Sequence, residues 1–143
     1  MFTIRFFLSW LMSAVAMYLS FFFWHGYYLN EISQLSYPRT LFYFFAGVTY
    51  LFISFLTIKV YDTKFLRGMI KNIFARGLIS GFIVGLLVFM VTKVTGISIG
   101  TSNTLEHLAL DAMWQCVEQI IGGFVISLGT LFIFDPRLEE DQI

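Results

Sequence analysis

The chain has 143 residues, of which 58% are hydrophobic and only 13% are charged, and its formal net charge is zero. A typical soluble domain is about 45–50% apolar and about 25% charged. A soluble domain of this size leaves much of its surface in water, so it could not hide this many apolar side chains. Zero net charge argues against nucleic-acid binding, and the single cysteine, Cys116, excludes an internal disulfide. The composition predicts an integral membrane protein that contacts the lipid bilayer.

Four apolar segments follow one another along the chain, and charged or polar residues bound each of them. They cover residues 6–24, 40–58, 77–92 and about 112–134. A transmembrane helix needs about 20 apolar residues, with a range of about 17–25, and in lipid the backbone has to satisfy its own hydrogen bonds. With their flanking residues, the segments predict helices over about 4–28, 40–61, 72–95 and 104–134, in a single domain that covers 1–143.

The first apolar segment also resembles a signal peptide. Arg5 precedes it, and Ala14-Val15-Ala16 resembles a cleavage site. The apolar run continues past that point to Trp24, which favours a retained helix, and cleavage stays as the alternative.

Lysine and arginine residues gather on one side of the predicted membrane. The connection between the second and third helices holds Lys59, Lys64, Arg67, Lys71 and Arg76. Such residues stay on the cytoplasmic side, so both termini are expected in the cytoplasm. The predicted fold is an all-α membrane protein, an up-down antiparallel bundle of four transmembrane helices in the bacterial inner membrane. Within the same connection, a plain cluster of positive charges on the cytoplasmic side is the favoured interpretation, and a short interfacial helix over residues 64–74 is the alternative.

Small residues recur at helical spacing in the third helix. Gly77, Gly81 and Gly85 form a GxxxGxxxG pattern, and residues four apart share one helix face. Glycines on such a face let the backbone of another helix approach closely. The pattern predicts close packing rather than the lining of a pore.

The fourth segment carries ionisable residues on a helix that has to enter lipid. At about 100° per residue, His107, Asp111, Trp114 and Glu118 fall within an arc of about 60°, and Gln115 extends the same side. From His107 to Glu118 this stripe descends roughly 16 Å. A charged side chain at that depth costs at least about 2.5–3.5 kcal/mol, which packing alone does not explain.

His25 ends the first helix, on the same outer side as the start of the fourth helix in the predicted topology. The first and fourth helices of an up-down bundle are usually neighbours. The sequence therefore predicts a polar, ionisable site near the outer leaflet between these two helices. The candidate ligand- or ion-binding residues are His25, His107, Asp111, Trp114, Gln115 and Glu118.

Several chemistries fit this set of residues and stay open. His25, His107 and Asp111 are possible metal ligands, and the two histidines are possible ligands of a haem iron. Glu118 is alternatively the buried group of an ion or proton site, although no ionisable residue of the same helix continues the path below it. A pocket for a small ligand is a further hypothesis.

The main alternative to a binding or ion-handling site is a structural role. The polar stripe would then pack the helices together or dock a membrane partner or a second copy of the chain, as expected for an accessory or assembly subunit of a larger complex. The sequence has no motif for a serine or cysteine nucleophile and no phosphate-binding glycine loop. The chain is therefore not expected to be an enzyme.

Overall fold

The structure is a computed structural model that describes residues 3–30, 33, 36, 38–97 and 105–133. Its elements are α1 (Ile4–Phe21), the π-helix η1 (Phe22–Tyr28), α2 (Arg39–Tyr61), α3 (Lys64–Met69), α4 (Ile73–Ile97) and α5 (Leu105–Phe132). The described residues contain no strand. Four helical stretches are long and apolar enough to cross a membrane, namely Ile4–Tyr28, Arg39–Tyr61, Ile73–Lys93 and Leu108–Phe132. The predicted all-helical fold with four long apolar helices is confirmed.

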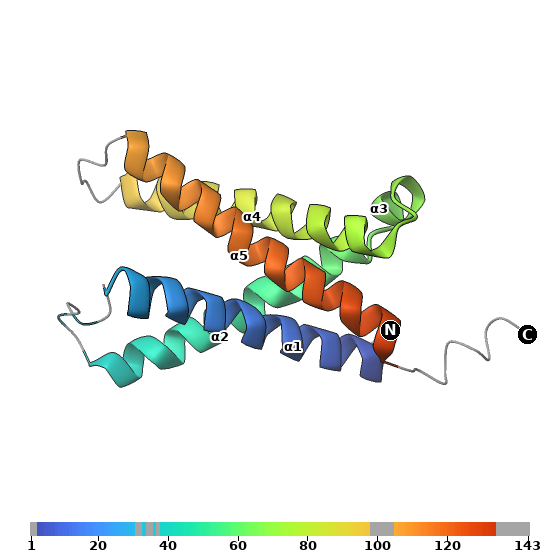
Figure 1. The fold of residues 1–143 in the computed structure, drawn as a ribbon, viewed down its shortest axis with the longest axis horizontal. Coiled ribbons are helices and arrows are strands. Elements are labelled where there is room, and N and C mark those ends of the chain that lie inside the picture. The colour runs from blue at the N-terminus through green and yellow to red at the C-terminus, as the bar shows by residue number, and fades with distance from the viewer. Residues whose placement is uncertain (1–2, 31–32, 34–35, 37, 98–104, 134–143) are drawn as a thin grey trace, which may run out of the picture.

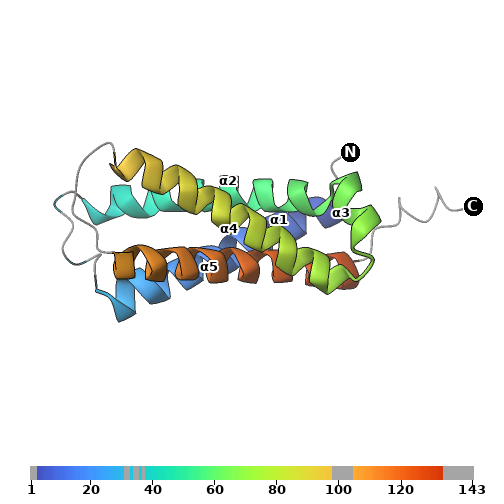
Figure 2. The same ribbon diagram turned by 90° about the horizontal axis from the view of Figure 1, so that it is seen from above.

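The long helices pack as neighbours in a defined order. α4 packs mainly on α5, and α1 contacts both α5 and α2. The end of η1, the start of α2, the end of α4 and the start of α5 lie at one end of the molecule, which we call the η1 end (Figure 1). The start of α1, the short helix α3 and the end of α5 lie at the opposite end, the α3 end, in both views (Figures 1 and 2).

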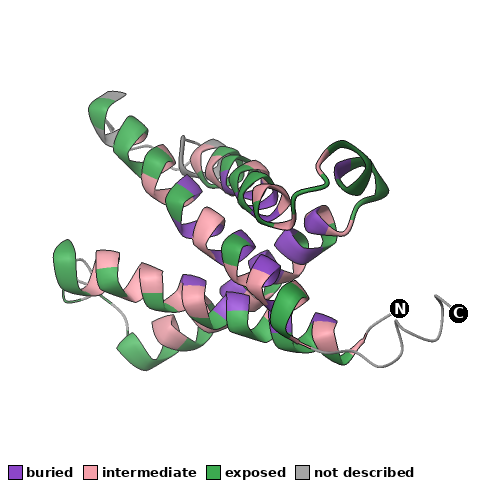
Figure 3. Cartoon of the chain, turned by 45° about the vertical axis from the view of Figure 1, so that its right-hand side comes forward, coloured by how far each residue is buried: buried purple, intermediate pink, exposed green. Residues whose placement is uncertain are grey.

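The interior of the bundle holds small and polar side chains together with two apolar clusters, and its outer faces carry large apolar side chains. Large side chains such as Leu19, Phe44 and Phe52 are more than half exposed. Figure 3 shows the buried residues where the helices cross and the exposed residues along their outer faces. This distribution suits lipid, in which exposed apolar side chains carry no penalty and small residues let helices pack closely. The buried polar residues are Ser9, Ser13, Ser54, Thr57, Ser80, Glu118, Gln119 and Ser127.

Side-chain donors join the helices through backbone carbonyl groups. Ser54 Oγ of α2 donates to the carbonyl oxygen of Trp10 in α1 at 2.8 Å, and Trp10 Nε1 donates to the carbonyl oxygen of Leu51 at 2.7 Å. Ser13 Oγ of α1 donates to the carbonyl oxygen of Gly122 in α5 at 3.0 Å. Hydrogen bonds between transmembrane helices contribute about 0.6–2 kcal/mol each. They fix how far α1 is rotated against both of its neighbours.

Glycines bring α4 and α5 into backbone contact. A Cβ atom added at Gly81 would overlap the carbonyl group of Gln119, and one added at Gly77 would overlap the carbonyl oxygen of Gly123. A side chain at either position of α4 would therefore push α5 away. The face of α4 that carries these glycines is the face on which α5 packs.

The structure divides the first predicted helix, which was expected to run without interruption over about 4–28. From Phe22 to Tyr28 the backbone forms a π-helix, and Leu29 N–H donates to the carbonyl oxygen of Trp24 at 2.8 Å. A π-turn closes its hydrogen bond over five residues instead of four, so the side chains beyond Phe22 are rotated relative to a continued α-helix. Short π-helical segments are frequent at functional sites.

The helix expected as the alternative over residues 64–74 is shorter in the structure. α3 ends at Met69, and Ile70 is extended, with φ −120° and ψ 97°. Asn72 then caps α4, because its Oδ1 accepts a hydrogen bond from the N–H of Ala75 at 3.1 Å. Asparagine is favoured at helix N-caps, so the chain starts a new helix here instead of continuing the old one.

We expect Gly81→Ala to lower the free energy of unfolding, because the added Cβ would overlap the backbone of α5. Overpacking of this kind costs about 1–3 kcal/mol. The matched control is Gly47→Ala in α2, where a Cβ atom would meet nothing within 4 Å. Both variants would be unfolded reversibly in detergent beside the wild type. Equal effects of the two substitutions would contradict the close approach of α4 and α5.

Candidate functional site

Glu118 lies inside the bundle near the middle of the apolar stretch Leu108–Phe132. Its side chain is 1% exposed. The Tyr50 hydroxyl of α2 and the Trp114 indole of α5 both face its carboxyl group. Trp114 precedes Glu118 by four residues, so the two side chains share one face of α5. The carboxyl group is therefore enclosed by aromatic residues from two helices.

Several polar atoms of Glu118 and of its neighbours along α5 are buried without a hydrogen-bond partner among the described residues. They are Glu118 Oε1, Trp114 Nε1 and both polar side-chain atoms of Gln119. The indole N–H of Trp114 thus faces the carboxyl group without reaching hydrogen-bond geometry. Buried polar groups are rarely unpaired, and each such group costs about 1–3 kcal/mol. We call Tyr50, Trp114 and Glu118 the Glu118 site.

Gln119 is a candidate functional residue that reasoning from the sequence missed. It is fully buried, and its Cβ lies 3.3 Å from the position that a Cβ atom of Gly85 would take. Gln119 lies about 100° around the helix from Glu118, so it fell outside the predicted stripe. The glycine spacing in the third predicted helix was the available signal, because it indicated a face on which another helix would pack.

Trp114 stacks on Trp24 of η1. The two ring centroids are 4.3 Å apart and the rings are 13° from parallel. Trp24 also stacks on Tyr28, with centroids 4.8 Å apart. Trp114 is one turn nearer the η1 end than Glu118, so the stacked rings lie between the buried carboxyl group and that end.

Asp111 and Gln115 belong to the predicted stripe, and both face α4. Asp111 Oδ2 lies 2.6 Å from Lys93 Nζ, and the Asp111 side chain is 54% exposed. Ion pairs this exposed contribute up to about 1 kcal/mol. Gln115 is half-buried, with its backbone carbonyl group toward Gly85. These two residues therefore join α4 and α5 near the η1 end.

The structure describes the two histidines to different extents. The ring of His25, in η1, lies 4.8 Å from the ring of Phe21. The side chain of His107 lies outside the described residues, although its backbone belongs to α5. Among the described side chains, no group of three His, Cys, Asp or Glu residues is placed to hold a metal ion. The metal or haem site built on His25, His107 and Asp111 stays a prediction.

The Glu118 site combines a carboxyl group, a phenol and an indole between apolar helices. No protein-family model, curated protein or solved structure matches this chain. A function is therefore proposed from the described residues and their chemistry.

We expect the Trp24–Trp114 stack to contribute measurably to stability. In a double-mutant cycle of Trp24→Leu and Trp114→Leu, the expected coupling is about 0.5–1.5 kcal/mol, as for other aromatic pairs. The measurement is the free energy of unfolding of the four proteins in detergent. The control cycle combines Trp10→Leu with Trp114→Leu, because Trp10 is bonded to α2 instead. Two equally small coupling energies would show that the stack contributes nothing.

Proposed function

We propose that this integral membrane protein binds a proton or a small cation at the Glu118 site, where α5 faces Tyr50 of α2, in the half of the bundle nearer the η1 end. The observation that carries the proposal is the unpaired Oε1 of a carboxyl group that is 1% exposed. A buried charge without a partner is strongly destabilising. Among the described residues, the ion pairs of Lys and Arg engage Asp62 and Asp111, and none of them engages Glu118. A bound proton or cation would supply the missing positive charge.

The groups around Glu118 favour a small, hard, singly charged ligand. Carboxylate oxygens are ligands that hard cations prefer, and Glu118 Oε1 is unpaired among the described residues. Gln119 also packs against the glycine face of α4, which limits the room for a larger molecule. One carboxylate balances one positive charge. Tyr50 of α2 is the neighbouring titratable side chain that faces this carboxyl group.

Access to Glu118 is proposed from the η1 end. Asp111 lies seven residues before Glu118, about 10.5 Å along the helix axis, and it is half-exposed beside Lys93. Toward the α3 end, the next buried polar side chain of α5 beyond Gln119 is Ser127, whose hydroxyl group donates to the carbonyl oxygen of Ile73. Ionisable groups of α5 thus lie on one side of Glu118, which supports a binding site more than a complete transmembrane relay.

Docking of a partner subunit fits the Glu118 site less well. Glu118 is 1% exposed and Gln119 is fully buried within one chain, so a partner could not touch either side chain directly. Asp111 is more accessible, but its carboxylate is already paired with Lys93. The unpaired atoms therefore support a ligand inside the bundle rather than a second protein outside it.

We expect Glu118→Gln to keep the fold and abolish binding, because the amide has nearly the same shape but carries no charge. The fluorescence of Trp114, which faces the carboxyl group, would be followed as pH is varied and, separately, as Na⁺ or K⁺ is added. Wild-type protein should respond and Glu118→Gln should not. Trp114→Phe removes the reporter, and Asp111→Asn is the matched carboxylate control, which should respond like the wild type. A response in Glu118→Gln identical to that of the wild type would refute the proposal.

We expect Glu118→Leu to raise the free energy of unfolding. Replacing a buried ionic group by a well-packed apolar one is often stabilising, by up to about 4 kcal/mol. A large loss of stability would instead mean that the carboxyl group holds the helices together, which would favour the structural alternative. The measurement is reversible unfolding of both proteins in the same detergent.

We also propose that the four long helices cross the membrane alternately up and down, with both termini in the cytoplasm. The support is the gathering of cations at the α3 end, because such residues stay on the cytoplasmic side. The η1 end, with the nearby Glu118 site, would then face outward. These cations are Arg5, Lys59, Lys64, Arg67, Lys71 and Arg76. A bacterial inner membrane as the location stays a prediction.

Orientation is testable with a membrane-impermeant thiol reagent applied to intact cells. Ser36 and Asn72 are exposed in the structure. Ser36 lies in the connection between η1 and α2, and Asn72 caps α4 in the connection that follows α3. In a Cys116→Ser background, we expect Ser36→Cys to react from outside and Asn72→Cys to be protected until the cells are opened. The reverse labelling pattern would invert the orientation.

A further inference from the structure

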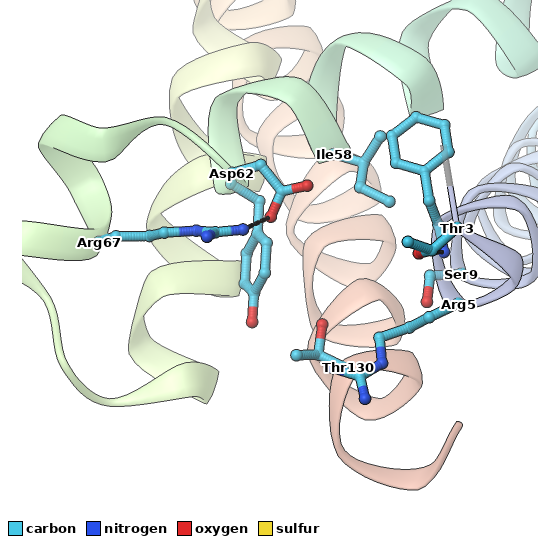
Figure 4. Close-up of a pocket in the computed structure, with 9 residues that line it drawn as sticks. Thr3, Arg5, Ser9, Ile58, Asp62, Arg67 and Thr130 are labelled. Carbon is cyan, nitrogen blue, oxygen red and sulfur yellow. Dashed lines mark hydrogen bonds and ion pairs between the residues drawn. The ribbon is translucent and has the colours of Figure 1, made fainter. Parts of the chain in front are cut away.

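A polar cavity lies at the α3 end, at the opposite end of the bundle from the aromatic stack of Trp24 and Trp114. Its volume is about 170 Å³, several times the roughly 30 Å³ share of one water molecule. α1, α2, α3 and α5 all contribute to its wall (Figure 4). We call it the α3-end cavity, and its polar lining includes Arg5, Ser9, Tyr61, Asp62, Arg67 and Thr130.

Two arginines reach this cavity from different elements. Arg5 extends toward Thr130, and Arg67 extends toward Asp62 (Figure 4). Arg67 Nη2 is 2.6 Å from Asp62 Oδ1, so its charge is partly balanced. Arg5 donates from Nε to the carbonyl oxygen of Ile133 at 3.0 Å. Among the described residues, its terminal nitrogens have no hydrogen-bond partner, and the side chain lines the cavity.

The residues that line the cavity also include two hydroxyl groups that can donate a hydrogen bond to a ligand. Ser9 lines the cavity, is 1% exposed, and its Oγ has no hydrogen-bond partner among the described residues. The Tyr61 hydroxyl accepts a hydrogen bond from Arg76 Nη2 at 3.0 Å, which leaves its own proton to be donated. Arg76 lies against the Tyr61 ring, 4.4 Å from its centroid, and its Nε is another buried atom with no partner among the described residues.

Positive charge dominates the surroundings of the cavity. Arg5 and Arg67 line it, Arg76 contacts the lining residue Tyr61, and Lys59 Nζ lies 5.4 Å from the ring centroid of the lining residue Phe6. Asp62 is the one carboxylate among the described lining residues. An arginine with free N–H groups beside donating hydroxyls is the arrangement that proteins use to bind phosphate.

We propose that the α3-end cavity binds a phosphate group, carried either by an anionic phospholipid headgroup or by free phosphate. The cavity lies at the end of the bundle where lysine and arginine gather, and such clusters attract anionic lipids at a membrane surface. Arg5 contributes charge and directed hydrogen bonds, and Ser9 and Tyr61 contribute neutral donors. The site is separate from the Glu118 site and does not depend on the function proposed for it.

The test uses the purified full-length protein in detergent and isothermal titration calorimetry. The ligands are dihexanoyl phosphatidic acid, inorganic phosphate and dihexanoylglycerol, which matches the lipid but lacks phosphate. We expect the phosphatidic acid to bind and dihexanoylglycerol not to bind. Arg5→Gln and Ser9→Ala should each weaken binding about tenfold, since hydrogen bonds to a charged group are among the strong ones. Lys71→Gln removes an exposed charge at the same end of the bundle and should change affinity little.

The two phosphate sources give different results in the same titrations. Competition between inorganic phosphate and the lipid means that the phosphate group itself is recognised, lipid binding without competition means a headgroup, and binding of inorganic phosphate alone means the free ion. Binding of dihexanoylglycerol as tight as that of phosphatidic acid would overturn the proposal, as would a failure of both phosphatidic acid and inorganic phosphate to bind. Affinities for Ser9→Ala and Arg5→Gln equal to that of Lys71→Gln would overturn it as well. Ser9→Ala removes an unpaired hydroxyl and should fold normally, so the test stands even if Arg5→Gln does not fold.

Discussion

The backbone contact between α4 and α5 determines where the polar residues of α5 point. Gly77 and Gly81 leave no room for a side chain between the two helices, and Gln119 lies against the glycine face. Since adjacent residues are about 100° apart on a helix, Glu118 then turns away from α4. It points toward Tyr50 of α2, inside the bundle. Rotating α5 to expose Glu118 to lipid would require breaking this glycine contact.

The remaining helices are held by hydrogen bonds together with two apolar clusters, one that includes Ile126 and one that includes Met17. Lipid provides no hydrophobic driving force between helices, so close packing and polar contacts decide how they associate. Ser13, Ser54 and Trp10 each donate to a backbone carbonyl group of a neighbouring helix. These bonds are made over short distances and in defined directions, so they specify one rotation for each helix. These interhelical hydrogen bonds thus stabilise the fold. The helices that they join also enclose the carboxyl group of Glu118, whose Oε1 has no hydrogen-bond partner among the described residues.

The two ends of the bundle differ in chemistry. The η1 end carries stacked aromatic rings and the exposed Lys93–Asp111 pair, which lie above a buried carboxyl group. The α3 end carries arginines around a cavity with an unpaired buried hydroxyl group. A carboxylate favours a cation, and arginines favour an anion. The proposed ligands of the two sites are therefore opposite in charge and would bind in opposite halves of the bundle.

Properties that depend on composition and helical period could be read from the sequence alone. The length and apolarity of four segments predicted four long helices, and the spacing of Glu118 and Trp114 placed them on one face of their helix. Features that depend on contacts between distant segments were decided only by the tertiary structure. Residues far from Gln119 in the chain bury it beside α4, and the π-helix at Phe22 rotates Trp24 relative to a continued α-helix. Whether a buried polar atom finds a partner depends on how neighbouring helices are rotated, and the local pattern of one helix carries no information about that rotation.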